Sequence, residues 1–359
     1  MRLVRFLLGD STRPGIPAGD EIVDLSPVSR TMEGLIARGL NVVEAIEAQL
    51  DDLPRQPLAD VEILAPLRPA SLRDFLAFED HAKAGAARRG EELNPAWYEM
   101  PVYYKGNHRS ILGPGQPLVW PSWTEKLDFE TEVACILGAR GRDLTEDEAQ
   151  HAIFGYTIMN DWSARDVQRW EYQPLGPFLA KSFGTTVSPW VVTLDALEPF
   201  RVPRSPRPEG DPPPLPYLDG AEDRSRGGLD LGLTVSLRSA RMREEGMEPM
   251  RVSCGRFAAL YWTVAQLLTH HASNGCNLRP GDLLASGTVS GPAPELRGCL
   301  LERTWRGTEP LALPTGETRR FLEDGDEVVM RGRCSREGFA TIGFGECRGV
   351  ILPASEPRK

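Results

Sequence analysis

The chain has 359 residues, of which 41% are hydrophobic and 26% charged, and its formal net charge is −10. This length allows a large buried core and two domains, and the composition is ordinary for a globular protein. The negative charge, with no basic stretch to offset it, argues against a nucleic-acid partner. No apolar stretch reaches the roughly 18 residues of a membrane span, and the charged N-terminus is not typical of a signal peptide.

The cysteine pattern also predicts the cellular compartment of the protein. Six cysteines are scattered along the chain, and no Cys-x-x-Cys pair occurs among them. Such a pattern favours free thiols in a reducing cytoplasm over a disulfide framework or a zinc site. We therefore expect a cytoplasmic protein with no membrane partner.

Residues 1–65 predict a small N-terminal domain. Short apolar segments alternate with turns, and one helix is expected near Thr31 to Leu50. Two proline-punctuated joins follow at 53–57 and 65–69. The predicted domains are therefore residues 1–65 and residues 66–359.

A helix is predicted to begin at Ser71 and to run towards Gly90. On such a helix Asp74 and His81 are seven residues apart, so they would lie nearly in line, two turns from each other. Arg88 follows at the same spacing and Arg89 one residue later, so an acid, a histidine and an arginine can share one side. A lone histidine on a helix is more often a packing or surface residue, so this stretch alone does not define a site. A strand ending in a glycine turn is expected within 101–108.

The segment from Leu127 to Leu137 predicts a strand, on which Glu130 and Glu132 would point to the same face. Two like charges about 4 Å apart repel by about 4 kcal/mol at an effective dielectric of 20. Two explanations remain open on these residues alone. The glutamates lie on a solvated face, which is the commoner case, or a hard cation such as Mg²⁺ or Ca²⁺ lies between them.

A capping box at 145–148 predicts a helix, and a buried strand follows over 154–159. Asp161 comes directly after this strand, at a corner where functional side chains are often exposed. A second helix is expected to start with a similar box at 163–166. On this helix Arg165, Gln168 and Tyr172 form one polar face. The alternative is a solvated face, with Trp170 on the core side.

The remaining elements carry weaker signals. Lys181 lies in a glycine-flanked loop without the Walker A pattern, and residues 199–228 predict a proline-rich surface excursion. An amphipathic helix is expected over 256–273, with His270 and His271 as structural or surface residues. A strand over 283–286 places Thr288 just beyond its end.

Two long strings of residues resemble the fumarylacetoacetate hydrolase family. The first runs from Met159 through Asp166 and continues to Thr186, and the second runs from Gln266 through Asp282 to Thr288. The resemblance extends from about residue 70 to the end. It implies a mixed α+β fold, with a small SH3-like N-terminal domain followed by a β-roll catalytic domain. It also implies a homodimer, a divalent metal and hydrolysis of a carbon–carbon bond in a β-diketone acid.

Residue by residue, the resemblance implies roles for positions of this chain. The metal ligands would be Asp74, Glu130, Glu132 and Asp161, and four carboxylates suit Mg²⁺ or Ca²⁺. His81 would be the catalytic base and Glu302 its partner. Arg165, Gln168 and Lys181 would stabilise the oxyanion and enolate. The substrate-binding positions would be Arg89 (with Arg88 as the alternative), Tyr104, Tyr172 and Thr288, and Thr185 would lie near the metal.

One departure from the family pattern concerns the substrate pocket, because Leu76 stands where the family has a substrate-contacting tyrosine. The expected substrate is a small diketo acid, with fumarylacetoacetate first. The alternative is a related 2,4-dioxo acid handled by an acylpyruvate-type hydrolase, decarboxylase or tautomerase. A third possibility, a non-catalytic metal-binding dimer, conflicts with the number of matched polar positions.

Overall fold

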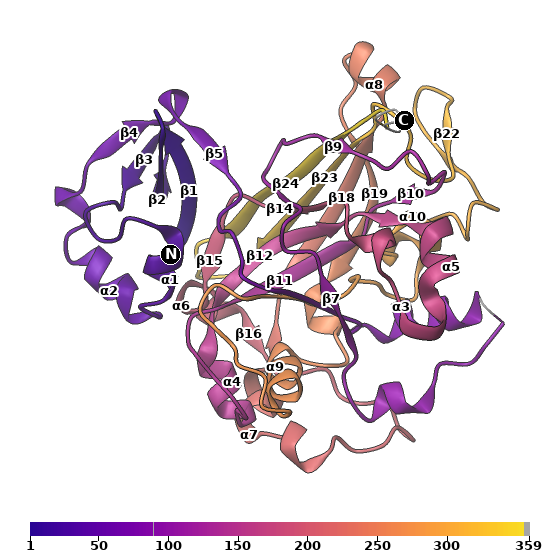
Figure 1. Cartoon of the computed structure of the whole chain (residues 1–359), viewed down its shortest axis with the longest axis horizontal. Coiled ribbons are helices and arrows are strands. Elements are labelled where there is room, and N and C mark those ends of the chain that lie inside the picture. Colours follow the sequence, from indigo (N-terminus) through magenta and orange to yellow (C-terminus); the bar gives the residue numbers. More distant parts are fainter. Residues whose placement is uncertain (89, 355–359) are drawn as a thin grey trace.

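The computed structural model describes residues 1–88 and 90–354. Its N-terminal part is an antiparallel sheet packed against two short helices (Figure 1). The strands are β1 (Arg2–Leu8), β2 (Ser11–Ala18), β3 (Glu21–Asp24), β4 (Arg55–Pro57) and β5 (Glu62–Leu64). The helices are α1 (Met32–Ile36) and α2 (Asn41–Glu47). The single helix expected over 31–50 is wrong, because Gly39 adopts a φ of 66° and separates the two pieces.

The strand order of the first sheet continues from β1 into the larger C-terminal part, in the order β1-β15-β12-β11-β20-β6-β7. The strands added here are β15 (Val191–Thr193), β12 (Ile153–Asp161), β11 (Thr131–Leu137), β20 (Leu283–Ala285), β6 (Leu72–Phe75) and β7 (Tyr103–Gly106). Next to β12 lies β14 (Thr185–Val187), which also pairs with β8 (Ile111–Leu112). Strands β11 and β12 are buried along their whole length, which places them in the centre of the fold.

A second sheet packs on the first, with β12 in contact with β23 and β24. Its order is β19 (Met250–Arg256), β18 (Gly232–Arg238), β23 (Glu327–Cys334), β24 (Ile342–Leu352) and β9 (Leu118–Val119). The main hydrophobic core includes side chains from both sheets, among them Ile158, Met330 and Phe344. The result is a mixed α/β fold whose two sheets share one core.

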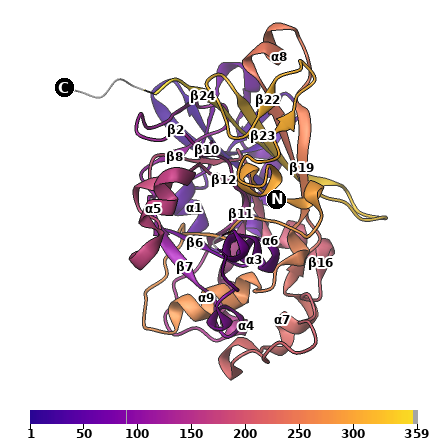
Figure 2. The same ribbon diagram turned by 90° about the vertical axis from the view of Figure 1, so that its right-hand side faces the viewer.

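Helices cover two regions of this core (Figures 1 and 2). The first group is α4 (Glu146–Ala152), α7 (Ala221–Arg226) and α9 (Val264–Ala272), with α4 packed on both of the others. The second group is α3 (Glu79–Ala87), α5 (Arg165–Leu175) and α10 (Leu300–Arg303), which lies near the ends of β6, β11 and β12. The second group borders the site described below.

Several expected elements have different boundaries. The residues from Ser71 begin as strand β6, because pairing with β20 and β7 buries them, and the helix starts only at Glu79. The predicted helix over 256–273 shortens to α9, which begins after a capping box at Thr263. The predicted capping box at 163–166 is wrong, since Ala164 precedes α5 and makes no side-chain cap. Trp170 is not on the core side either, because it is 83% exposed.

The proline-rich excursion is ordered and attached to the body of the protein. It contains β16 (Arg201–Val202), η6 (Pro216–Leu218), α7 and β17 (Gly228–Leu229). Arg207 stacks on the rings of Tyr261 and Trp262, with its guanidinium carbon 4.5 Å from each ring centre. The six cysteines are free. Within the described part of the chain, none of the helices combines the length and apolar character needed to cross a lipid bilayer.

Candidate active site

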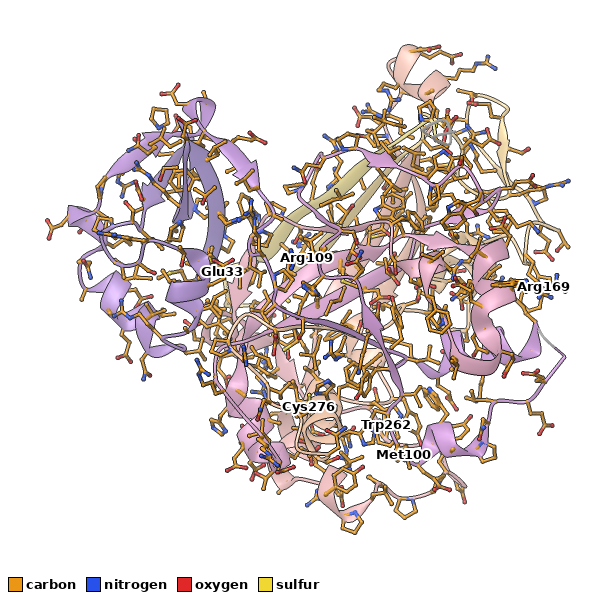
Figure 3. All side chains as sticks on the ribbon, in the orientation of Figure 1. Glu33, Met100, Arg109, Arg169, Trp262 and Cys276 are labelled. Carbon is orange, nitrogen blue, oxygen red and sulfur yellow. The ribbon has the colours of Figure 1, made fainter. Side chains whose placement is uncertain are left out.

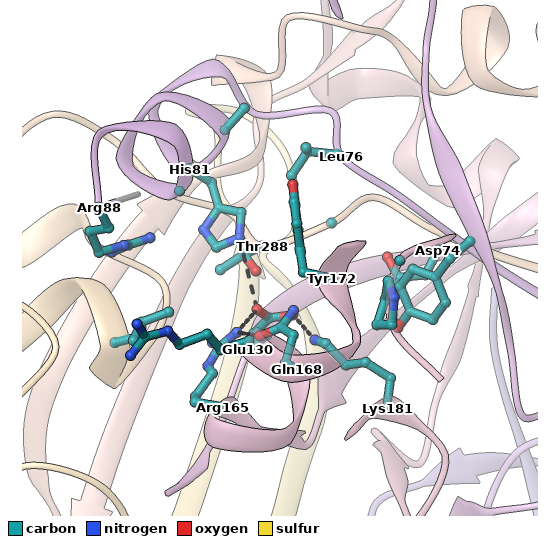
Figure 4. A pocket seen from close by; sticks show the side chains of 18 of the residues that line it. Asp74, Leu76, His81, Arg88, Glu130, Arg165, Gln168, Tyr172, Lys181 and Thr288 are labelled. Carbon is teal, nitrogen blue, oxygen red and sulfur yellow. Dashed lines mark hydrogen bonds and ion pairs between the residues drawn. The ribbon is translucent and has the colours of Figure 1, made fainter. Parts of the chain in front are cut away.

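A cavity of about 520 Å³ lies between α3, α5 and the ends of the central strands (Figure 4). Most residues predicted for the site line it. They are Asp74, Leu76, His81, Arg88, Tyr104, Glu130, Glu132, Arg165, Gln168, Tyr172, Lys181 and Thr288. Asp161 and Glu302 lie behind this lining, in contact with Lys181 and His81. Arg89 lies outside the described residues.

The carboxylates of Asp74 on β6, Glu132 on β11 and Asp161 on β12 lie close together. Oxygen atoms of these three residues all lie within 4.8 Å of one another, and all three side chains are buried. Burial, reinforced by the neighbouring carboxylates, raises the pKa of Asp74 and of Glu132 well above their usual values. Buried like charges at this spacing are unfavourable unless a cation or protons compensate them.

The polar atoms of this carboxylate trio also fit a metal ion. Within the described part of the chain, Asp74 Oδ1 and Glu132 Oε1 are buried and have no hydrogen-bond partner. Buried oxygens normally have one, so these two are free to coordinate a ligand. Oxygen ligands of this kind suit a hard divalent cation. The residues present therefore fit Mg²⁺, Ca²⁺ or a similar ion.

Tyr104 fixes the geometry of the trio. Its hydroxyl lies 3.0 Å from Asp74 Oδ2 and 2.5 Å from Asp161 Oδ2, while the backbone N–H of Gly287 donates to Glu132 Oε2 at 3.1 Å. Burial and the nearby carboxylates raise the pKa of Tyr104 well above its usual value, so the hydroxyl remains a donor. The family resemblance implies substrate binding for Tyr104, whereas its hydroxyl contacts the carboxylates of Asp74 and Asp161.

Glu130 is separated from the trio by a break in the predicted strand. The segment 127–137 forms β10 (Leu127–Asp128) and β11, and Glu130 lies in the joint between them. Its carboxylate pairs with the Lys181 ammonium and with Arg165 Nη1 at 2.7 Å. Burial raises the pKa of Glu130, but Lys181 and Arg165 outweigh that effect and hold the pKa below its usual value. Glu130 is thus ionised and already neutralised by two cations, and its role as a metal ligand remains a prediction.

Lys181 links Glu130 to the trio, because its ammonium also lies 2.6 Å from Asp161 Oδ2. Burial alone would lower the pKa of Lys181, but Asp161 and Glu130 raise it above its usual value. The lysine is therefore a fixed positive charge in the wall of the cavity.

Asp128 is an important residue that sequence reasoning missed. It is fully buried and accepts a hydrogen bond from Arg165 Nε at 2.8 Å. Its two oxygens also accept from the backbone N–H groups of Leu300 and Leu301, at the start of α10. Asp128 thereby connects Arg165 to the helix that carries Glu302. Its sequence signal was present, since it continues the alternation of Glu130 and Glu132 by one step.

His81 and Glu302 form the expected pair. His81 Nδ1 lies 3.2 Å from Glu302 Oε2, and His81 Nε2 lies 3.8 Å from Glu130 Oε1. Ser290 Oγ and Cys299 Sγ also donate to Glu302 Oε2, at 2.7 Å and 3.3 Å. Burial would raise the pKa of Glu302, but His81, with Arg88 and the Ser290 hydroxyl, lowers it to about 2. Glu302 is therefore ionised at neutral pH and can orient the imidazole.

Several donors in the cavity wall are buried without a partner among the described residues: Arg88 Nε and Nη1, Arg165 Nη2 and Thr288 Oγ1. Buried donors are rarely left unpaired, so these atoms are suited to binding the oxygens of a ligand. Burial also lowers the pKa of the Arg88 guanidinium, as expected for a cation with little compensation. Lys126, Arg169 and Arg306, which were not predicted, add positive charge around the cavity (Arg169 is labelled beside α5 in Figure 3).

Comparison with known proteins identifies the family. The family profile for the fumarylacetoacetate (FAA) hydrolase C-terminal domain matches residues 71–351. Fumarylacetoacetase of Arabidopsis thaliana is 40% identical over 397 aligned residues, covering 95% of this chain and 91% of that protein. The Homo sapiens fumarylacetoacetase is 41% identical, covering 96% and 93% of the two chains.

Solved structures share the fold at lower sequence identity. A fumarylacetoacetate hydrolase from Exiguobacterium antarcticum superposes with a TM-score of 0.62 at 24% identity, covering 98% of this chain and 99% of the other. A maleylpyruvate hydrolase from Sphingobium sp. SYK-6, solved with manganese(II) and pyruvate, gives 0.61 at 20% identity, covering 99% and 100%.

The fold and the site define the class of protein: an enzyme with a buried carboxylate site for a divalent metal next to a His–Glu pair. The family match over most of the chain then supplies the particular assignment. The chain belongs to the fumarylacetoacetate hydrolase family, and it is a carbon–carbon bond hydrolase.

Proposed function

We propose that the enzyme hydrolyses fumarylacetoacetate to fumarate and acetoacetate. One observation supports this most strongly: a buried carboxylate trio with two unpartnered oxygens shares a cavity with the His81–Glu302 pair. The relatives named fumarylacetoacetase, similar over nearly the full chain, support the choice of substrate.

The metal would be held by Asp74, Glu132 and Asp161, with Glu130 as the predicted fourth ligand. The oxygen-only donor set favours Mg²⁺ or Ca²⁺ over a soft metal. When bound, a divalent cation would orient the two diketone oxygens and withdraw electron density from them. Lys181 remains beside Asp161 and limits the negative charge that faces the substrate.

His81 is the proposed general base. Its Nδ1 faces the ionised Glu302, so Nε2 is available to take a proton from water. The water oxygen forms a bond to the fumaroyl carbonyl carbon, and the bond from that carbon to the adjacent methylene then breaks. The electron pair of that bond passes into the acetoacetate enolate, and His81 gives its proton to the former methylene carbon, which becomes the methyl group of acetoacetate. One water is consumed, and two acids are released.

The unpartnered donors have complementary tasks in this scheme. Arg165 Nη2 and Thr288 Oγ1 are buried in the cavity wall, where they could stabilise an oxyanion. Gln168 accepts from Arg165 Nη1 at 3.0 Å and so holds that guanidinium in place. Arg88 offers two free N–H groups to a terminal carboxylate of the substrate, a role that the sequence assigned first to Arg89. Tyr172 completes this wall of the cavity.

Turnover by the purified enzyme tests the proposal. Fumarylacetoacetate is compared with acetopyruvate and other 2,4-dioxo acids, after chelation and after addition of Mg²⁺, Ca²⁺ or Mn²⁺. The proposal predicts the highest kcat/KM for fumarylacetoacetate and activity that depends on added metal. Preference for a monoacid substrate by tenfold or more would contradict it.

One observation favours the second candidate, an acylpyruvate-type reaction. Leu76 lines the cavity and offers no hydrogen bond to a substrate oxygen. A pocket that presents an apolar side chain at this point suits a diketo acid with an apolar acyl end. The intact His81–Glu302 pair favours hydrolysis over decarboxylation or tautomerisation within this second candidate.

We further infer a cytoplasmic homodimer, with an SH3-like unit over residues 1–65 and a β-roll over 66–359. Free cysteines support the compartment. Exposed apolar side chains near the end of α5, including Leu175 at 79% and Leu179 at 61% exposed, support association. Light scattering after size exclusion would test the dimer, and a monomer at micromolar concentration would contradict it.

A further inference from the structure

Glu171 is a buried acid that neither the sequence comparison nor the proposed mechanism uses. It lies on α5, three residues after Gln168, and is 6% exposed. Its carboxylate accepts three backbone hydrogen bonds from consecutive residues: Phe178 N at 2.8 Å, Leu179 N at 2.9 Å and Ala180 N at 3.2 Å. A carboxylate that accepts backbone N–H groups makes some of the stronger hydrogen bonds in proteins.

These three N–H groups belong to the segment that supplies Lys181. The short 3-10 helix η4 (Leu179–Lys181) ends at that lysine, so the bonds to Glu171 fix the backbone immediately before it. Lys181 is almost fully buried, and its ammonium contacts both Glu130 and Asp161. A shift of the helix would therefore move the cation that joins Glu130 to the carboxylate trio.

Among the described residues, few other polar contacts hold the segment before η4; one is Ser182 Oγ, which donates to the carbonyl of Phe178 at 2.6 Å. The helix α5 loses its helical geometry at Gln173, where φ is −112° and ψ is 136°, and Gly176 adopts a φ of 93°. Leu175, Phe178 and Leu179 are 79%, 52% and 61% exposed, so apolar packing contributes little there. On the far side of Lys181, Asn107 Nδ2 donates to the carbonyl of Ser182 at 2.8 Å. Among the described residues, the Glu171 carboxylate thus accepts three of the hydrogen bonds that order the chain between Gly176 and Lys181.

We propose that Glu171 is a positioning residue that sets the place of Lys181 in the active site. Glu171 holds the backbone N–H groups of Phe178, Leu179 and Ala180 by hydrogen bonds. The position of this backbone determines where the Lys181 ammonium meets Glu130 and Asp161. The inference rests on the proposed function for the catalytic meaning of Lys181, but the backbone contacts can be measured without substrate.

The matched pair of variants is Glu171→Gln and Glu148→Gln. Glu148 also accepts from backbone and hydroxyl groups, in the capping box of α4, but it does not line the cavity. In Glu171→Gln, the amide NH₂ faces at least one of the three N–H groups and cannot accept from it. Hydrogen–deuterium exchange of the peptide covering 175–182 should be faster in Glu171→Gln and unchanged in Glu148→Gln. Unchanged exchange in both variants would overturn the inference.

Kinetics then separate positioning from general destabilisation. Glu171→Gln should lower kcat about tenfold or more, with KM changed less than about threefold, while Glu148→Gln matches the wild type. In a Lys181→Met background, the Glu171 substitution should cost less than about threefold further, because both changes remove the same contribution. Additive losses, or a Glu171→Gln kcat within twofold of wild type, would overturn the inference.

Two controls keep these results interpretable. If Glu171→Gln does not fold, Glu171→Asp keeps the charge on a shorter side chain and is judged by the same exchange and kinetic criteria. If the wild type does not hydrolyse fumarylacetoacetate, the proposed function fails, whereas the exchange result still decides whether Glu171 orders the segment. If the wild type is active and the variants behave additively, only the positioning role fails.

Discussion

Replacing Glu302 by glutamine tests whether the negative charge of Glu302 enables His81 to act as the general base. The Glu302 carboxylate oxygen lies 3.2 Å from His81 Nδ1, and both groups are shielded from solvent. A unit charge pair at that distance interacts by about 5 kcal/mol at an effective dielectric of 20. The amide oxygen of glutamine keeps a hydrogen-bond acceptor, so we expect a loss of about 3–4 kcal/mol in transition-state stabilisation.

A loss of that size lowers kcat about 100- to 1,000-fold. The assay is steady-state hydrolysis of fumarylacetoacetate with saturating metal, with Glu309→Gln as the control because Glu309 is exposed on the same segment. KM should change less than about threefold, since Glu302 lies behind His81 and is not part of the cavity lining. If Glu302→Gln retains kcat within threefold of the wild type, the proposed role of the pair is refuted.

Three further predictions concern metal, pH and the substrate pocket. Asp74→Asn should weaken the binding of a divalent cation about 100-fold, as measured by calorimetry. The same substitution should raise the Tm of the chelated protein, because three buried carboxylates close together destabilise the fold when no cation is bound. An unchanged affinity would show that Asp74 is not a metal ligand. Glu302 has its pKa lowered from 4.5 to about 2, so it should stabilise the fold by up to about 3 kcal/mol above pH 4.5 and lose that contribution as the pH falls to about 2. Urea unfolding of wild type and Glu302→Gln across that range checks this, and a difference that grows on acidification would contradict it. Leu76→Tyr should improve kcat/KM for fumarylacetoacetate relative to a diketo acid with an apolar acyl end. If the wild type already hydrolyses fumarylacetoacetate efficiently and the tyrosine variant gains nothing, Leu76 does not alter the substrate preference of the pocket.

Most residues predicted for the site line one cavity, although the local structure predicted around some of them is wrong. Asp74 and His81 were expected on one helix, yet one lies on β6 and the other on α3, and they still line one cavity. The helical spacing was misleading because pairing with β20 and β7 decides the conformation of β6, and those partners are far away in the chain. The family resemblance did not depend on that local prediction.

The break at Glu130 could not be read from the sequence either. Alternating acids on a β-rich segment favour a continuous strand. Asp128, however, accepts a hydrogen bond from the backbone N–H of Leu300 at the start of α10, 172 residues away in the sequence. The side chain of Asn160 also replaces a ladder contact by accepting from Glu130 N at 3.1 Å. Such side-chain contacts with distant backbone depend on the tertiary fold, so local spacing does not reveal them.

The role of Glu171 was hidden for a related reason. Its position on α5, next to Tyr172, gives no sign that its carboxylate turns to the backbone of residues 178–180. The exposure of Phe178 and Leu179, which leaves this segment with little apolar packing, is likewise visible only in the structure.

The most direct test of the central claim is the fate of the water oxygen. Fumarylacetoacetate is turned over in oxygen-18 water with added metal, with short reaction times and a protein-free control for ketone exchange. Hydrolysis through His81 predicts one labelled oxygen in the new carboxylate of fumarate, and no product when His81 is replaced by alanine. Formation of a decarboxylated or isomeric product without label, or unchanged turnover by His81→Ala, would contradict the claim.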